Sequence, residues 1–287
     1  MKNPTLSVII LNYNTRQLTI ACLKSVIACR NELDFEIIIV DNGSTDDSLD
    51  EIRKLDFKGV KNTIIENSQN LGFAKGNNTA RGTVKGKYVL FLNTDTLVNP
   101  GVFIETVDYL EEHNDVGVVT CKLVLANGTI DPDSRRAFPT PWVALTHFSG
   151  LDRLFPKSPI LSKYWYGHIS PEIVIDIDVA QGAFFLTRKK ILDDVGWFDE
   201  IYFLDGEDID LSWKIKQKGL KIVYYPRVWI RHFKKQTKKL NKAFVGRGVD
   251  SMAIFYKKWL WSRYPFFVNW LVMIGIHLIK LMRSVFK

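Results

Sequence analysis

Apolar segments that alternate with helical segments are the feature that most constrains how this chain folds. The four expected strands are residues 6–11, 35–40, 63–66 and 87–92. The helices expected between them are residues 16–28, 47–55 and 76–84. Strands that are apolar throughout are buried on both faces of a sheet, and helices join them when they run parallel. The chain up to residue 92 therefore predicts a parallel sheet built from βαβ units.

Polar residues follow each of these strands directly. They are Asn12-Tyr13-Asn14, Asp41-Asn42-Gly43-Ser44, residues 67–70 and Asn93-Thr94-Asp95. Ligands of open α/β sheets bind beyond the carboxyl ends of the strands, so we expect these side chains to converge on one rim and form a site. No GxGxxG motif follows the first strand and the sequence has no P-loop, which argues against a dinucleotide-binding Rossmann domain.

The second half of the chain is less regular. Strands are expected over 116–125, over 174–186 with Gln181-Gly182-Ala183 inside it, and over 220–225 leading to 228–232. Short helices are expected over 189–195 and 208–218, whereas the proline-rich segment 132–171 is expected to be irregular. The simplest division is a catalytic domain, 1–240, with halves 1–95 and 96–240, followed by a tail, 241–287.

Composition excludes several classes of protein. The chain of 287 residues is 46% hydrophobic and 24% charged, which is typical of globular proteins and excludes a disordered, collagen-like or disulfide-scaffold chain. Its three cysteines lack metal-ligand spacing and indicate reduced thiols in a cytosolic compartment. The N-terminal apolar run ends at Asn12, so it is too short for a signal peptide and predicts a strand instead.

Charge is divided unevenly along the chain. Residues 1–210 carry 21 Lys and Arg against 30 Asp and Glu, whereas residues 211–287 carry 18 basic residues and one acid. Such a tail indicates an anionic partner. Sixteen uncharged residues, rich in Trp, Phe and aliphatic types, lie between Arg263 and Lys280, fewer than the ~20 that cross a bilayer core. We therefore expect a helix lying in a membrane surface and no nucleic acid, with packing on the domain or in a homodimer interface as the alternatives.

Two acidic clusters have positions that suit chemistry. Asp95 lies where the sheet opens to solvent and is a candidate ligand of Mg²⁺ or Mn²⁺, with capping of a helix near Pro100 as the alternative. Residues 205–210 (DGEDID) place four acids before an amphipathic helix, where mutual repulsion raises proton affinity and suits a general base. A solvated helix N-terminus favoured by the helix dipole would also explain them.

Two further segments carry residues with suitable chemistry. His232 follows the late strand, where a neutral imidazole is a candidate metal ligand and a structural histidine is the alternative. Residues 70–78 (NLGFAKGNN) offer glycines for close backbone approach, Lys75 for positive charge and a helix N-terminus for phosphate. A turn that needs two glycines explains the same residues.

Five motifs occur in a known order: VDNGSTD, NLGFAKGNN, LFLNTDT, QGAFFLTRKKILDDVGWFDE and FLDGEDIDLSWKIKQKG. In this order, over residues 5–235, the chain resembles glycosyltransferase family 2, and most closely its bacterial rhamnosyltransferase-like branch, which builds cell-surface polysaccharides. The resemblance implies a GT-A fold, which is an α/β fold with a Rossmann-like, mostly parallel sheet. It also implies a nucleotide-diphospho-sugar donor, Mn²⁺ or Mg²⁺ as cofactor, and inversion at the anomeric carbon.

The resemblance assigns roles to individual residues. Donor contacts fall on Asn12, Tyr13, Asn14, Asp41, Asn42, Ser44, Asn70, Gly72, Lys75, Asn77, Asn93 and Thr94. Acceptor contacts fall on Gln181, Gly182, Ala183, Trp197, Asp199, Glu207, Arg135 and Arg136. Asp95 matches the last acid of the DxD motif, whose first acid is replaced here by Asn93, and His232 matches a metal ligand. Asp208 matches the base that takes the proton of the acceptor hydroxyl.

The resulting hypothesis is a metal-dependent inverting glycosyltransferase bound through its tail to the cytoplasmic face of the cell membrane. The first expected donor is dTDP-rhamnose, and the expected acceptor is a lipid-diphosphate-linked glycan. Three alternatives stay open: a UDP-hexose donor, a nucleotide-sugar pyrophosphorylase, and a sugar-nucleotide-binding scaffold without catalysis. A pyrophosphorylase would carry a Gly-rich basic loop where this chain has NYNTRQ.

Overall fold

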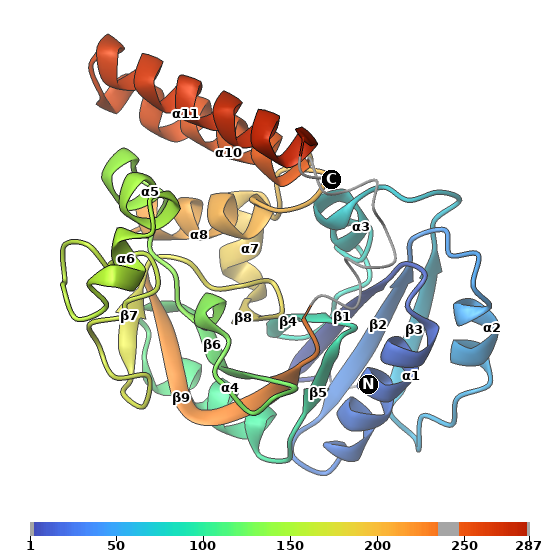
Figure 1. The fold of residues 1–287 in the computed structure, drawn as a ribbon. Coiled ribbons are helices and arrows are strands. Elements are labelled where there is room, and N and C mark those ends of the chain that lie inside the picture. Colours follow the sequence, from blue (N-terminus) through green and yellow to red (C-terminus); the bar gives the residue numbers. More distant parts are fainter. Residues whose placement is uncertain (1–2, 235–246, 286–287) are drawn as a thin grey trace.

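The computed structural model describes residues 3–234 and 247–285, which form a sheet with helices on both faces and a helical C-terminal segment (Figure 1). The first half confirms the four predicted strands: β1 (Leu6–Asn12), β2 (Phe35–Asp41), β3 (Lys61–Glu66) and β4 (Tyr88–Asn93). They lie parallel in the order β3-β2-β1-β4. Because all four run the same way, their polar ends lie at one edge of the sheet.

The helices between these strands follow the prediction except for α3. α1 (Arg16–Ala28) has the predicted bounds and α2 (Ser48–Arg53) lies within its predicted segment, but α3 (Phe73–Asn78) begins and ends earlier than residues 76–84. Gly72 precedes α3 with a φ of 84°, which turns the chain into the helix. Gly76 lies inside the helix because a Cβ there would approach Leu11 of β1 to 2.8 Å, so this glycine permits close packing.

The second half of the sheet is mixed rather than parallel. β8 (Phe184–Arg188) runs antiparallel to β4, and β6 (Val116–Leu125), β9 (Lys221–His232) and β5 (Thr96–Val98) follow it across the sheet. β7 (Ile175–Ile177) pairs with β9. The prediction of one strand over 174–186 is wrong, because a loop joins β7 to β8 and contains Gln181-Gly182-Ala183. This loop is held beside the site by the backbone hydrogen bond from Val179 to Arg136, at 2.9 Å.

β9 is one long strand in place of the two predicted pieces. Its pairing with β6 slips from Cys121–Tyr225 to Lys122–Trp229, so Pro226 falls in a bulge where no ladder hydrogen bond is required of it. At its far end, β9 pairs with β5, and His232 lies opposite Thr96. The bulge therefore lets a single strand reach the end of β4.

Two short helices occupy the segment predicted to be irregular: α5 (Pro141–Phe148) and α6 (Leu151–Leu154). Pro141 stands in the first turn of α5, where the missing N–H removes no helical hydrogen bond. The remaining α-helices are α4 (Val102–Glu112), α7 (Lys189–Val195), α8 (Glu207–Gln217), α10 (Arg247–Phe255) and α11 (Phe266–Val285).

The core has one hydrophobic layer on each face of the sheet. Alternate residues of β1 illustrate this, since Leu6 and Val8 pack in the layer that contains α1 and α4, whereas Ile9 packs in the layer beneath α7 and α8. All three side chains have no exposed surface. These layers fix the strands, and thereby the rim at which the polar residues lie.

The C-terminal segment packs on α8 through a third hydrophobic cluster. Trp213 of α8 contacts Phe255 at 5.6 Å and Trp259 at 6.0 Å between ring centroids. Trp259 lies in η3 (Tyr256–Leu260), a turn of π-helix between α10 and α11, and its indole N–H donates to Asp210 at 2.6 Å. The predicted boundary between residues 240 and 241 lies outside the described residues, but the described part of the tail packs on α8.

No helix of the described residues is both long and apolar enough to span a membrane. α11 has 20 residues, and it exposes large apolar side chains on one face while Val272 and Met273 pack toward the third cluster. The sequence left packing on the domain as an alternative to a helix lying in a membrane surface. One face of α11 does pack in this way, and its other face is exposed.

We expect Leu260→Ala to lower the free energy of unfolding by about 2–5 kcal/mol, because Leu260 is 1% exposed between the tail and α8. Leu271→Ala is the matched control, since Leu271 is 67% exposed on α11 and leaves no cavity. Urea titration of the two full-length variants measures the difference. Equal stability of both variants would contradict the packing of the tail on α8.

Candidate functional site

The ends of β1 and β2 form the first part of the rim. Asn12 is buried and donates from Nδ2 to Asp41 Oδ1 at 2.7 Å and to Ser44 Oγ at 3.0 Å. Asp41 Oδ2 accepts the backbone N–H of Ser44 at 2.9 Å. Asn14, with a φ of 51°, donates its backbone N–H to the same Ser44 hydroxyl. The predicted convergence of these strand ends is confirmed.

The loop before α3 is tied to this rim through Asn42. Its Nδ2 donates to Asn70 Oδ1 at 2.9 Å and to the Gly72 carbonyl at 3.1 Å. A Cβ at Gly72 would lie 2.4 Å from the carbonyl oxygen of Phe203, so only glycine lets the loop pack against the segment that leads into α8. This contact connects the rim at the ends of β1 and β2 with the acidic segment at the start of α8.

The remaining donor-side residues differ in exposure. Tyr13 is half-buried, Lys75 is exposed on α3, and Thr94 is buried, where its hydroxyl accepts from Thr15 at 3.2 Å. Asn77 is 1% exposed, and its amide donates to the Phe73 carbonyl within the helix. The donor contact at Asn77 stays a prediction.

Pairing of β5 with β9 brings His232 to Asp95. His232 Nε2 lies 3.4 Å from Asp95 Oδ1, and its Nδ1 lies 2.9 Å from Oδ2 of the fully buried Asp131. Lys234 donates to the other oxygen of Asp131 at 2.8 Å and also bonds Asp133. The sequence analysis missed Asp131 and Lys234, and no sequence signal links Asp131 to a histidine about a hundred positions away.

These contacts determine the charges of the buried groups. Burial opposes the charged imidazolium, but the hydrogen bonds to Asp131 and Asp95 outweigh it and raise the pKa of His232 to about 9. Burial likewise disfavours a charged Asp131, yet the hydrogen bond from His232 and the charge of Lys234 lower the pKa of Asp131 to about 2. His232 therefore carries a proton between two carboxylates unless a cation replaces that proton on Nε2.

The residues around Asp95 fit a divalent cation with two protein ligands. The described residues contain no group of three His, Cys, Asp or Glu side chains that could hold a metal ion. Asp95 and Nε2 of His232 nevertheless form a carboxylate–imidazole pair, and Asp131 holds Nδ1 as carboxylates hold metal-binding histidines. Mn²⁺ or Mg²⁺ bound by so few protein groups fills its shell with phosphate oxygens and water.

Asp208 lies at the start of α8, opposite the loop that contains Gly182. Its Oδ2 accepts from Arg136 at 2.5 Å and from the Gly182 backbone N–H at 3.4 Å, while its Oδ1 accepts from Ile209 N at 2.8 Å. The side chains of Asp208 and Arg136 are only 10% and 12% exposed. Arg136 thus fixes the direction of the carboxylate that the sequence assigns to the base.

Two short links place Asp208 and Asp95 at the same edge of the sheet. Gly182 contacts Asp208, and the carbonyl of the next residue, Ala183, accepts the backbone N–H of Asn93 at 3.3 Å. Asn93 is the last residue of β4, two positions before Asp95. The two carboxylates are thus connected through the loop that contains Gly182 and the end of β4.

Glu207 is buried beside Asp208 without a partner for one oxygen. It is 6% exposed, and its Oε2 has no hydrogen-bond partner among the described residues. Burial, reinforced by the charges of Asp208 and Asp205, raises the pKa of Glu207 well above its ordinary value. The raised proton affinity predicted for the acidic cluster is thus found at Glu207.

Four predicted acceptor residues have side chains that other parts of the chain already engage. Trp197 is fully buried, with its ring 5.9 Å from that of Phe91, and Ala183 is buried in the core. The guanidinium of Arg135 donates to the Ser170 carbonyl at 3.1 Å. Asp199 pairs with Lys258 of the tail at 2.6 Å. The acceptor contacts of these four residues stay predictions.

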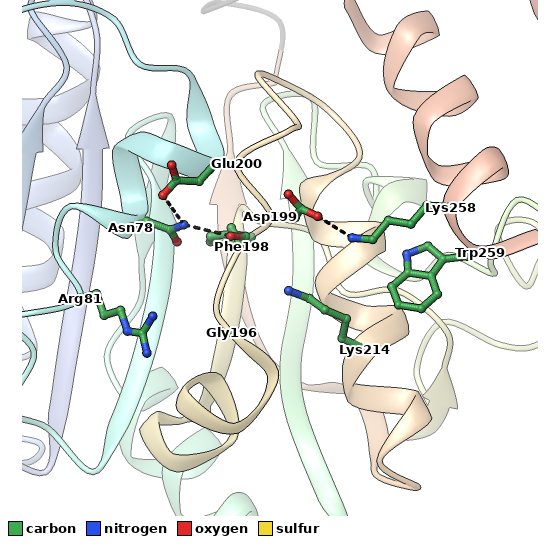
Figure 2. A pocket seen from close by; sticks show the side chains of 9 residues that line it. All are labelled: Asn78, Arg81, Gly196, Phe198, Asp199, Glu200, Lys214, Lys258 and Trp259. Atoms are coloured by element: carbon green, nitrogen blue, oxygen red, sulfur yellow. Dashed lines mark hydrogen bonds and ion pairs between the residues drawn. The ribbon is translucent and has the colours of Figure 1, made fainter.

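A cavity of about 510 Å³ lies beside this site and not within it (Figure 2). It is bounded by α3, the loop after α7, α8 and the tail, and its lining includes Arg81, Asp199, Lys214 and Lys258. Figure 2 shows the ion pair between Asp199 and Lys258 among the residues that line it. Asp95, His232 and Asp208 are not part of its lining.

Comparisons with known proteins agree with the motif order. The sequence model of the Glycosyl transferase family 2 matches residues 7–196. An uncharacterized glycosyltransferase of Haemophilus influenzae is 37% identical over 116 residues, which cover 39% of this chain and 35% of that protein. An N-acetylglucosaminyl-diphospho-decaprenol L-rhamnosyltransferase of Mycobacterium tuberculosis is 24% identical over 214 residues, covering 71% of this chain and 68% of its own.

Solved structures share the fold. A mannosyltransferase from Pyrobaculum calidifontis, in complex with GDP-Man and Mn²⁺, superposes with a TM-score of 0.59 at 19% identity. The match covers 90% of this chain and 65% of that one. At this identity the likeness establishes the GT-A fold and not the substrate.

We expect Glu207→Gln to stabilise the protein at neutral pH. When folding raises the pKa of an acid, the protein loses stability as the pH rises from the pKa of the unfolded state, about 4.3, through the pKa of the folded state. The penalty from Glu207 is therefore present at pH 7 and absent below pH 4. The neutral glutamine removes that penalty. Thermal unfolding across pH should show an advantage for the variant that shrinks to zero on acidification, while Glu112→Gln, at an exposed position of α4, shows none. A stability difference between the variant and the unmodified chain that does not change with pH would contradict the raised pKa of Glu207.

Proposed function

The chain belongs to glycosyltransferase family 2, and from that premise we propose that it is a metal-dependent, inverting glycosyltransferase. It transfers a sugar from a nucleotide-diphospho donor to a saccharide acceptor in the synthesis of a cell-surface polysaccharide. The observation that carries this proposal is the placement of Asp208, held by Arg136 and the Gly182 N–H, at the same edge of the sheet as Asp95 and His232.

The proposed mechanism needs one carboxylate on the acceptor side. Asp208 takes the proton of the acceptor hydroxyl while that oxygen forms its bond to the anomeric carbon and the bond to the donor phosphate breaks on the opposite face. Arg136 and Gly182 hold Oδ2, so the carboxylate is positioned before the acceptor arrives. Asp95 and His232 would hold Mn²⁺ or Mg²⁺, which offsets the charge that collects on the leaving diphosphate.

The donor occupies the rim made by the first strands. Asn12, Asp41 and Ser44 form a closed hydrogen-bond group that suits a nucleoside, and Asn70 and Gly72 present amide and backbone groups beside it. Lys75, exposed on α3, adds positive charge near the diphosphate. We propose dTDP-rhamnose as the first donor, supported by the mycobacterial rhamnosyltransferase among the relatives, with a UDP-hexose as the second candidate.

The proposed acceptor is a glycan linked to a lipid through diphosphate, met at the cytoplasmic face of the cell membrane. α11 supports this, because its exposed face carries aromatic and aliphatic side chains flanked by Lys257 and Lys280. Helices of this composition lie in the bilayer interface. The proposal makes the protein peripheral, attached beside its acceptor.

We expect Asp208→Asn to lower turnover by roughly 10²–10⁴-fold, since the amide cannot accept the hydroxyl proton. Donor binding should change by less than a few fold, because the residues proposed to bind the nucleoside lie at the ends of β1 and β2 and not on α8. Release of nucleoside diphosphate from a panel of dTDP-, UDP- and GDP-sugars measures turnover, and calorimetry measures binding. Asp194→Asn, at an exposed position of α7, is the isosteric control. Full turnover in the Asp208 variant would favour a non-catalytic scaffold.

Removal of metal should abolish turnover, and added Mn²⁺ should restore it. His232→Ala and Asp131→Asn should each raise the Mn²⁺ concentration needed for half-maximal turnover. The increase should be about 10–100-fold for Asp131→Asn, because Asp131 orients the metal ligand His232 and does not itself bind the metal. Calorimetric titration of Mn²⁺ in the presence of nucleoside diphosphate provides a readout independent of turnover. His277→Ala, exposed on α11, should behave as the unmodified chain does. Turnover that resists chelation would exclude a metal at Asp95.

A further inference from the structure

The segment that contains α5 and α6 exposes an unusual number of large apolar side chains. We call residues 139–163 the α5–α6 surface. Its exposed side chains are Trp142 at 50%, Leu145 at 57%, Phe148 at 47%, Leu154 at 71%, Phe155 at 53% and Ile160 at 64%. Six large exposed apolar side chains within 25 residues of sequence indicate a contact with a partner or a membrane.

The charged residues of this surface are of one sign where they meet solvent. Its one acid, Asp152, is 6% exposed and bonds His147 at 2.6 Å, so it is used inside the segment. Arg153, Lys157 and Lys163 are exposed. Aromatic and aliphatic side chains beside exposed basic groups fit an anionic lipid surface, in which the apolar groups enter the interface and the basic groups meet the phosphates.

The α5–α6 surface adjoins the tail. The ring of Phe138, just before α5, lies 4.6 Å from that of Trp213 and 6.3 Å from that of Phe255 in α10. α11 packs in turn against α10, and Figure 1 shows α5 at the same end of the molecule as this helix pair. α11 exposes a stripe of the same composition, made of Phe266, Phe267, Trp270, Leu271, Ile274, Leu278, Leu281 and Met282.

Both ends of the segment are attached to the acceptor side of the site. At its start, Arg136 bonds Asp208, and the N–H of Ala137 donates to the Tyr164 carbonyl at 2.8 Å. At its end, the indole of Trp165 donates to Asp133 at 2.9 Å. A contact that fixes the position of the α5–α6 surface therefore also fixes the position of the residues on the acceptor side of the site.

We propose that the α5–α6 surface is a second membrane-contact site, which docks together with α11 on a bilayer containing anionic lipids. The proposal rests on the proposed membrane attachment of the tail and extends it. Two contacts orient the enzyme on the bilayer, whereas one amphipathic helix only tethers it.

The test measures co-sedimentation of the full-length protein with phosphatidylglycerol-rich vesicles and with pure phosphatidylcholine vesicles. Leu145→Ser, Phe148→Ser and Leu154→Ser are combined in one variant, and Arg153→Glu with Lys157→Glu in another. We expect each to weaken binding to the anionic vesicles by about tenfold or more, since several apolar side chains or two favourable charges leave the interface. The melting temperature should match that of the unmodified chain, and turnover on a short, water-soluble acceptor should stay within twofold of it. Turnover on an acceptor embedded in the vesicles should fall.

Matched variants separate this proposal from the attachment of the tail. Lys24→Glu with Lys61→Glu changes the same charge on the first half of the chain and should leave binding unchanged. Trp270→Ser, Leu271→Ser and Ile274→Ser test α11 itself. Loss of binding in the α11 variant with full binding in both α5–α6 variants would overturn the second contact and leave the tail proposal intact. Dissociation of an oligomer by the α5–α6 variants, without loss of vesicle binding, would also overturn it by making this face a contact between copies.

Discussion

Buried charges that are paired across distant parts of the chain hold this site together. Asp131 binds His232 and Lys234, and Arg136 binds Asp208, all in positions with little access to water. Removing one member of such a pair leaves an uncompensated buried charge and costs about 3–5 kcal/mol. The pairs therefore act as structural connections between β9, the segment after β6 and α8. The same connections give each functional side chain a fixed direction.

The tail belongs to this arrangement and is more than an appendage. Asp210, two positions after Asp208 on α8 and fully buried, accepts from Lys258 at 2.7 Å and from Trp259 at 2.6 Å. Ser251 of α10 donates to the Leu204 carbonyl in the loop that leads to Asp208. α8, the helix that carries Asp208, is thus held by the segment that exposes the apolar stripe, so the proposed base and the proposed membrane contact share one support.

How much the sequence predicted depends on how local the determining interactions are. The parallel strands, α1 and α7 follow from apolar periodicity and turn residues within each segment, and their positions are confirmed. The rim residues Asn12 and Asp41 were found because strand ends must meet in a parallel sheet. Asp131 was missed because its partner His232 becomes a neighbour only through the pairing of β6 with β9, which no local pattern encodes. The complete burial of Trp197 was not predicted for a related reason, since a motif position does not reveal that a ring packs in the core.

Three buried polar atoms near Asp208 lack hydrogen-bond partners among the described residues, which fits the proposed sugar acceptor. Around Asp208, the Nε of Arg136, the Oε1 of Gln181 and the Oε2 of Glu207 are buried without a hydrogen-bond partner among the described residues. Each such atom costs stability, and folded proteins keep few of them. A donor and two acceptors beside one carboxylate complement the hydroxyl groups of a sugar, which both donate and accept. Because a protonated Glu207 can also donate, the raised pKa of this residue extends the range of hydroxyl orientations that the site accommodates. The stability lost at these atoms is consistent with a site whose hydrogen bonds are completed by its acceptor.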